Sequence, residues 1–344
     1  MSSGKEIKAA FKKASAWGTA AACASGDVLL ITGEKINQSI EHLPDDSAGQ
    51  AFHADRDRGL ITCSGELSAY LRYQGLGVLL ALALGAAGSP SAHGASGFDH
   101  QLRMAGDLDG LFGTLAVYKG FSVHEFASAK VDGFTIEGQA GQPLTASFSL
   151  ICDGRSINTD SGANTNATMA ALSAPATGNR VLFRQGAFMI NDAEGDALDS
   201  GDVITPSRFS LSLRRGLAGD HLAGGEDKIA EPAHAAFPEL SLSLEFPTYT
   251  SDTYLSDLGS DARKKMRIDF IGGEIESGVN YAFSLIMPHV VITNAEAAVD
   301  GAGKIAHPIS ASLLATATQR SGMSGITGPL AIDLTNTRAT DLLA

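Results

Sequence analysis

The chain has 344 residues, of which 44% are hydrophobic and 18% charged, and it contains 39 glycines. This composition excludes intrinsic disorder and favours short strands and turns over long exposed helices, in a length that allows two ordinary domains. The formal net charge is −13, so the chain as a whole lacks the excess of basic residues with which proteins bind nucleic acid.

Residues 1–24 are predicted to form an N-terminal arm that docks on the body or on a neighbouring subunit. Within this arm, residues 5–16 place apolar side chains on one face of a predicted short helix and lysines around it. A basic amphipathic helix is also typical of a membrane surface, but we expect no membrane contact here. The arm lacks the apolar core of a secretory signal, so we expect a soluble protein made in the cytoplasm.

Residues 25–157 are predicted to form a first β domain. Strict alternation of apolar and polar residues predicts strands at 61–73 and 144–152, each with one buried and one wet face. The dense apolar run at 76–84 predicts a buried helix, and the glycine-rich stretch 85–97 predicts a loop. Cys63 and Cys152 fall in the apolar runs and are expected in the core, whereas the wide spacing of the three cysteines, which include Cys23, predicts neither disulfides nor a metal site.

The polar stretch 158–179 is predicted to be a linker, and residues 180–318 a second β domain. Strands are predicted at 207–213 and 240–246 by the same alternation, and a partly helical segment is predicted at 252–268. Residues 319–344 are predicted to form an extended C-terminal arm.

The two predicted domains repeat one order of elements. A tandem duplication of a β-rich unit is the simplest account, because the order agrees and the spacings differ only by loop lengths. The matched pairs are Gly26-Asp27-Val28 with Gly201-Asp202-Val203, the strand at Ile61 with that at Leu240, the helix at Leu76 with that near Asp261, and the strand-loop-strand at Ala129 with that at Val290.

No catalytic, cofactor-binding or metal-binding residues are predicted. The pairs Asp55/Asp57 and Asp107/Asp109 have a spacing that suits a hard cation, but interleaved arginines and flanking glycines favour solvated loops. The nine histidines show no ligand spacing and are expected on surfaces and in turns.

The pattern resembles that of bacteriophage tail tube proteins. The resemblance is carried by the segment AWGT at 16–19 with the following strand at Asp27, by GLITCSGELSAYLRYQGLGVLLALALG at 59–85, and by VDGFTIEGQAGQPLTASFSLICDG at 131–154. It implies an all-β fold with minor helix, a β-sandwich or half-barrel of tail-tube type, here in two tandem copies. It also implies a non-enzymatic virion protein that stacks as rings into a hollow tube for DNA.

The resemblance implies further copies of the chain as partners, in a trimeric, pseudo-hexameric ring whose arms 1–24 and 319–344 bridge neighbours. Terminator, tape measure and distal tail proteins are the other implied partners, with DNA only passing through. A tail terminator, or a tube protein of a related injection machine, is an alternative. A tandem β-sandwich binding module is an alternative of another class, disfavoured by an aromatic content of only 6%.

Overall fold

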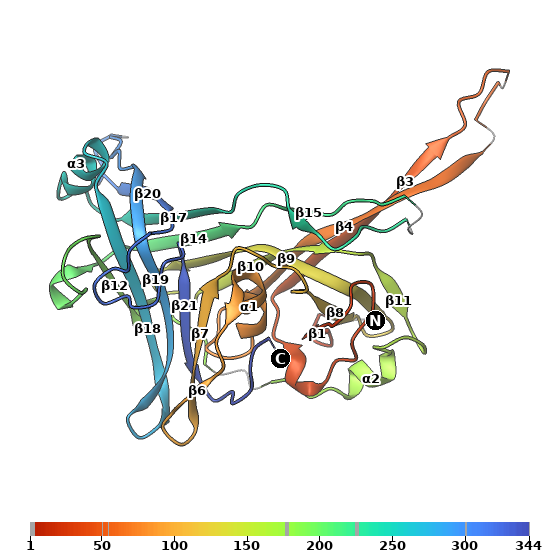
Figure 1. Ribbon diagram of the computed structural model, residues 1–344, viewed down its shortest axis with the longest axis horizontal. Coiled ribbons are helices and arrows are strands. Elements are labelled where there is room, and N and C mark those ends of the chain that lie inside the picture. The colour runs from red at the N-terminus through yellow and green to blue at the C-terminus, as the bar shows by residue number, and fades with distance from the viewer. Residues whose placement is uncertain are drawn as a thin grey trace.

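The computed structural model describes residues 4–49, 51–53, 55–175, 179–223, 227–299 and 301–343. This part of the chain is built mostly of antiparallel strands, with short helices at α1 (Gly77–Leu84), α2 (Asn166–Ala171) and α3 (Thr253–Gly259). The body is elongated, and the β3–β4 hairpin projects far from one end of it (Figure 1). The predicted all-β fold with minor helix is therefore confirmed.

Twenty-one strands carry the fold in the described residues. Those before residue 160 are β1 (Lys8–Lys13), β2 (Val28–Leu29), β3 (Gly33–Pro44), β4 (Arg56–Tyr70), β5 (Gly85–Ala87), β6 (Ser91–His93), β7 (Gly97–Met104), β8 (Gly113–Tyr118), β9 (Val123–Gln139), β10 (Thr145–Cys152) and β11 (Ser156–Asn158). Those after it are β12 (Gly186–Asp192), β13 (Val203–Ile204), β14 (Arg208–Arg214), β15 (Leu217–Ala218), β16 (Ala233–His234), β17 (Glu239–Phe246), β18 (Arg263–Glu276), β19 (Val279–Asn294), β20 (His307–Leu313) and β21 (Ala331–Asn336).

The strand pairing occurs twice in the same order. In the first half, β3 pairs with β4, β4 with β10, and β10 with β9; in the second, β14 pairs with β17, β17 with β20, and β20 with β19. The outer strands repeat as well, because β1 pairs with β2 and β8 as β12 pairs with β13 and β18. The pairing of β9 with β14 then joins the two halves into one sheet.

Local details repeat at matching places. Two 3-10 turns of identical sequence, Ser25–Asp27 and Ser200–Asp202, lead into β2 and β13. A register shift interrupts the β9–β10 pairing at Ser149/Leu150, and another interrupts the β19–β20 pairing at Ile292/Asn294. Independent strands have no reason to share both features, so the pairing supports a duplicated unit. The predicted boundaries at 25–157 and 180–318 remain a prediction, since one core serves both halves.

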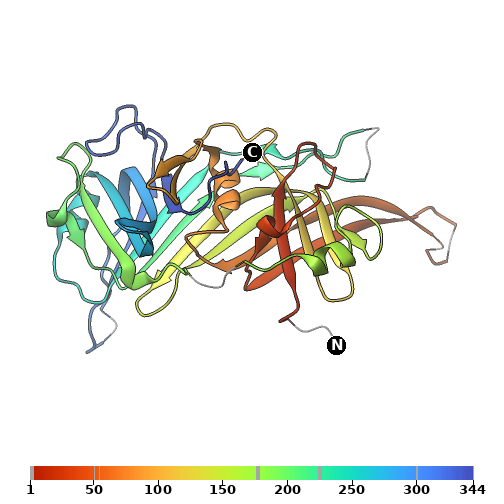
Figure 2. The ribbon, with the colours of Figure 1, turned by 90° about the horizontal axis from the view of Figure 1, so that it is seen from below.

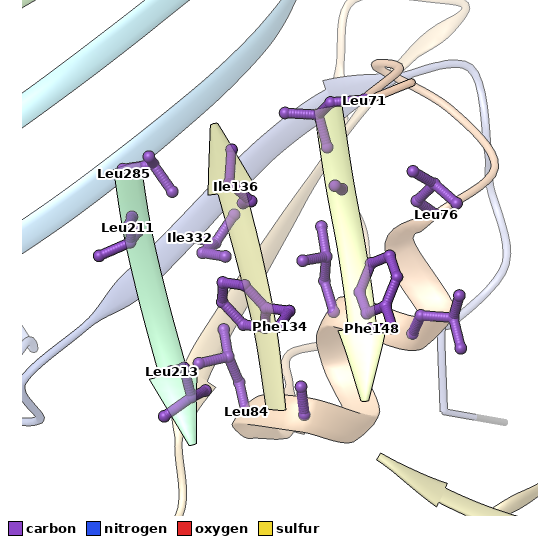
Figure 3. Packing of buried hydrophobic residues seen from close by; sticks show 14 of the residues in the cluster. Leu71, Leu76, Leu84, Phe134, Ile136, Phe148, Leu211, Leu213, Leu285 and Ile332 are labelled. Carbon is purple, nitrogen blue, oxygen red and sulfur yellow. The ribbon is translucent and has the colours of Figure 1, made fainter. Parts of the chain in front are cut away.

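The main core is one cluster of buried apolar side chains that runs through both halves, and two much smaller clusters lie beside it. Figure 3 shows Phe134, Phe148 and Leu211 on the neighbouring strands β9, β10 and β14, with α1 beneath them. The helix α1 is buried on every side, as its sequence predicts, and it ends at Gly85 in the left-handed region at φ 93°. A Cβ at that position would lie 2.6 Å from the side chain of Leu108, so only glycine fits.

Several expectations are corrected by the structure. The N-terminal segment is the strand β1 and not a helix. Ala9 and Phe11 pack into the main core while Ala10 between them packs into a smaller cluster, the alternation expected of a strand that is covered on both faces. The glycine-rich stretch 85–97 is not a plain loop, since β5 and β6 within it pair with β7. Figure 2 shows the N-terminal strands at one end of the body and the second-half strands at the other.

Other expectations were confirmed or need a smaller change. Cys63 and Cys152 are buried directly opposite each other on β4 and β10. The strand at Val290 is part of the long strand β19, and the predicted C-terminal arm supplies β21, which pairs with β19 and β7. Three histidines, His100, His289 and His307, are buried and not on the surface, because each contacts a backbone carbonyl oxygen at 2.9 to 3.0 Å.

The β9–β14 contact depends on Gly133. A Cβ added there would lie 2.1 Å from the carbonyl oxygen of Leu213, a backbone atom that cannot rotate away. We expect Gly133→Ala to lower the free energy of unfolding by about 1–3 kcal/mol through overpacking, measured by urea denaturation. Gly273→Ala is the control, because a Cβ there meets nothing within 4 Å. Equal effects of the two changes would show that the close contact is unimportant.

Candidate functional site: a hydroxyl-lined sheet face

The most distinctive surface is one face of the sheet formed by six neighbouring strands, β4, β10, β9, β14, β17 and β20. Residues that lie directly opposite one another across these strands form rows of short polar side chains. One row is Ser68, Ser147, Thr135, Ser212, Ser241 and Ser312, and the next is Tyr70, Thr145, Glu137, Ser210, Ser243 and Ser310. We call these two rows the hydroxyl face. They cross both halves of the chain without a break at the β9–β14 junction.

The local sequence forces this arrangement. On β17, residues Leu240, Leu242 and Leu244 are buried, while Ser241 and Ser243 between them are exposed. Successive side chains of a strand point to opposite faces, so burial of the leucines turns every serine outward. The same alternation holds on β14 and β20, and on β10 up to Leu150. Alternation was predicted from the sequence, but the alignment of the serines into rows was not.

Hydrogen bonds join the rows across strands. The hydroxyls of Ser68 and Ser147 lie 3.3 Å apart, and those of Thr135 and Ser212 lie 3.2 Å apart across the junction of the two halves. The hydroxyl of Ser210 donates to the Glu137 carboxylate at 3.4 Å. Apart from Tyr70 and Glu137, the side chains of the two rows are short hydroxyl groups, so most of the face is even and polar.

The charge within the two rows is negative, but two cations lie beside them: Arg208 is 3.9 Å from the Glu137 carboxylate, and Lys35 lies opposite Glu66 on β3. Glu66 flanks the rows on β4, and its pKa is lowered by hydrogen bonds from Ser147 and Ser68, the latter at 3.0 Å. Hydrogen bonds to the carboxylate favour the charged form, so Glu66 stays ionised near neutral pH. Glu66 and Glu137 also border a shallow depression of about 280 Å³, whose other lining residues are Thr135, Thr145, Ser147 and Ser149. The two rows contain no lysine or arginine.

The arrangement does not assemble a catalytic constellation around the face. In the described part of the chain, no group of three or more histidine, cysteine, aspartate or glutamate side chains is placed to hold a metal ion. Of the aspartate pairs considered above, Asp107 accepts the backbone N–H of Asp109 at 2.9 Å, which closes a tight turn. No site residues were predicted from the sequence, and the serine alternation was the signal from which the face could have been found.

Comparison with known proteins identifies the family. A family model described as phage tail tube protein matches residues 4–317, nearly the whole chain. The chain belongs to the phage tail tube protein family. The resemblance seen in the sequence is thereby confirmed, and the tail tube protein is a structural component of the virion tail in a family that is non-enzymatic in general.

Solved structures show weaker similarity to this tail tube protein. A chain of the anti-feeding prophage baseplate, from a 6-fold symmetrised cryo-EM structure, is 12% identical, with 41% of this chain and 92% of that chain covered and a TM-score of 0.29. A crystal structure of Hcp protein is 16% identical, covering 37% and 86%, with a TM-score of 0.24. No curated protein matches the tail tube protein significantly. Among its described helices, none is both long and apolar enough to cross a membrane.

Proposed function

We propose that this chain polymerises as stacked rings into the phage tail tube, and that the hydroxyl face lines the lumen through which DNA passes during ejection. The observation that carries the proposal is the unbroken hydroxyl face across both halves of the chain. Proteins hold the phosphate backbone mainly with lysine and arginine. The two rows lack both residues, and the neighbouring Arg208 and Lys35 lie beside the carboxylates of Glu137 and Glu66. With ionised Glu66 repelling phosphate, DNA slides past such a wall without being held.

The repeated pairing order supports a ring of three chains. Each chain contains two copies of the four-strand order, one in β3, β4, β10 and β9 and one in β14, β17, β20 and β19. Three chains then present six similar units, a trimeric ring with pseudo-hexameric symmetry. In this proposal, residues 25–157 and 180–318 are the ring-building units, 158–179 is the linker between them, and 1–24 and 319–344 are the arms.

The partners follow from the place of a tube in a virion. The chain is made in the host bacterial cytoplasm and assembles with copies of itself and with terminator, tape measure and distal tail proteins, without a membrane partner. The alternative role of a tail terminator differs in one measurable property, because a terminator makes a single capping ring and a tube protein grows to indefinite length. Negative-stain images of the purified chain at rising concentration distinguish the two.

Cysteine labelling tests the lumen assignment. In a Cys23→Ser background, which removes the partly exposed native thiol, single cysteines are placed at Ser212 on the hydroxyl face and at Ser256 on α3. Because α3 packs Tyr254 and Leu258 against the core, Ser256 lies on the other side of the sheet and is the matched control.

Both cysteines should react with a large polyethylene glycol maleimide in the dispersed chain. In assembled tubes, only the Ser256→Cys protein should react, since the bulky reagent is excluded from the lumen. Tubes in which Ser212→Cys reacts as fast as Ser256→Cys would place the hydroxyl face outside. A chain that never forms rings or tubes would contradict the proposed function itself.

A further inference from the structure

The junction inside the chain shows how one unit joins the next. The long strand β9 has two successive partners along one edge: its residues up to Ala129 pair with β8, and residues from Gly133 to Gln139 pair with β14. The change of partner follows the register shift opposite Ser149/Leu150. Beyond that shift, the end of β9 belongs to the sheet of the second unit.

In the second unit, the segment that follows the corresponding register shift has no partner strand. Its matching strand, β19, pairs with β18 as far as Val291, and its register shift opposite β20 lies at Ile292/Asn294. The residues that would correspond to the β14-pairing end of β9 are 295–299, and they form no strand or bridge in the isolated chain. The segment begins at the buried Ala295, whose carbonyl oxygen lies 3.0 Å from His307 Nε2, and the Glu296 N–H donates to Asn294 Oδ1 at 3.1 Å, a local bond that a new strand would replace. Val299 is 67% exposed although it is apolar, as expected of a segment that lacks its neighbour.

In the first unit, the strand edge that would receive such a segment also has no partner strand. The strand equivalent to β14 is β3, because β3 pairs with β4 as β14 pairs with β17. Among the described residues, β4 is the only strand that pairs with β3, so the outer edge of β3 is open. An open strand edge is a template for a further strand. Within this stretch the Ile36 N–H donates to the carboxylate of Glu34 at 3.0 Å, a local bond that an added strand would replace.

The register of the missing pairing follows from the repeated one. Lys35 lies opposite Glu66 on β4, and Ser210 lies opposite Ser243 on β17. Glu66 and Ser243 correspond, since they lie opposite Ser149 and Ser310, the residues at the two register shifts. Lys35 thus corresponds to Ser210.

Ser210 lies opposite Glu137 in β9, four residues beyond Gly133. Gly133 and Asn294 are the residues opposite Ser149 and Ser310, so Ala298 corresponds to Glu137. By this correspondence, Ala298 comes to lie opposite Lys35, and Glu296 opposite Asn37.

We propose that residues 295–299 of one copy add to the open edge of β3 at residues 34–38 of a second copy, as an antiparallel strand with Glu296 opposite Asn37. This inference rests on the proposed function and gives it the contact that closes the ring. The partner is a second copy of this chain, because the surface it offers is the one the chain already uses in its β9–β14 junction. Charge agrees with this register, since the exposed Lys35 lies diagonally beside Glu296 and next to Ala298.

The proposed contact also has the symmetry that a closed ring needs. The segment 295–299 and the edge of β3 lie on different parts of one chain, so their contact is a head-to-tail interface. Such an interface closes into a ring when the rotation from one copy to the next is a simple fraction of a turn. The two edges cannot meet within one chain, because β4, β10, β9, β14, β17 and β20 lie between β3 and β19 in the sheet.

Disulfide cross-linking tests the register. Directly opposite residues of an antiparallel pair have Cβ atoms about 4.5–5.5 Å apart, close enough for a disulfide after slight adjustment. In the Cys23→Ser background, Asn37→Cys and Glu296→Cys are combined in one chain and oxidised with copper phenanthroline at concentrations at which rings form. Two thiols lose two electrons and two protons to the oxidant as the S–S bond forms. Non-reducing gels should show covalent multimers up to the closed trimer, which reducing agent dissolves.

Three controls make the outcome decisive. Either single variant should stay monomeric on the gel, and so should Glu41→Cys with Glu296→Cys, which offers an exposed thiol on the same strand outside the register. Rings or tubes in the microscope without cross-links from the 37/296 pair would overturn this interface while leaving the proposed function intact. Equal cross-linking by the 41/296 pair would overturn the register. Absence of both rings and cross-links would overturn the interface and the proposed function together.

Discussion

Phe209→Ala is expected to lower the free energy of unfolding by about 3–5 kcal/mol, the range for a phenylalanine removed from a packed core. Phe209 is fully buried on β14, the strand that receives β9 from the first unit. Its ring centroid lies 5.4 Å from that of Phe188 in an edge-to-face arrangement and 6.0 Å from that of Phe270. Phe183, at 6.2 Å, completes the group.

The loss at Phe209 should be large because its neighbours cannot collapse into the cavity. Phe188 and Phe270 are held on paired strands, β12 and β18, and aromatic pairs add stabilisation beyond their buried area. Urea denaturation of the dispersed chain measures the effect. Phe237→Ala is the matched control, since Phe237 is 92% exposed and its loss should change stability by less than about 0.5 kcal/mol. Similar values for the two variants would contradict the assigned core.

Asn164→Ala is expected to cost about 2–4 kcal/mol and to loosen the N-terminal arm. Asn164 is buried, and its amide nitrogen donates to the Glu125 carboxylate at 2.7 Å and to the Ala21 carbonyl at 3.0 Å. Its amide oxygen accepts the backbone N–H of Cys23 at 2.8 Å. Alanine would leave the buried Glu125 short of a donor and the arm without two of its anchors.

The effect of Asn164→Ala should be local as well as global. Hydrogen exchange is expected to speed up at the backbone amide of Cys23, whose acceptor is lost, while amides within β17 keep their protection apart from the global change. Asn280→Ala is the control, because Asn280 is an exposed asparagine on β19. If the Cys23 amide exchanged at the same rate in both variants, the Asn164 contact would not be what holds the arm.

Two strands with strict alternation were predicted almost to the residue, whereas the strand predicted at 61–73 begins earlier and ends earlier, as β4 at Arg56–Tyr70. The run predicted at 240–246 is β17, Glu239–Phe246, and that predicted at 207–213 is β14, Arg208–Arg214. Burial of one face constrains every second residue, so the pattern carries both the element and its orientation. The helix α1 was predicted equally well, because its leucines and alanines favour helix and their lack of a polar side requires burial.

The N-terminal strand β1 could not be predicted in the same way. Its sequence, KAAFKK, fits a helical face as well as a strand, and its three central residues are buried together. What selects the strand is the pairing with β8 and β2, which come later in the chain. The buried histidines were missed for a related reason, since the carbonyl groups of Arg338 and Ala315, which contact His100 and His289, come from later segments of the chain.

The all-β class, the repeated order of elements and the alternation that turns serines outward could be predicted from the sequence, because each follows from short-range patterns of burial. The folded chain was needed to show that β14 adds to the end of β9, that the serines of six strands form continuous rows, and that β3 keeps an open edge. These features depend on the register between segments far apart in the chain. Register depends on which backbone groups and buried side chains pair in the folded sheet. A local sequence pattern does not show how distant segments pair.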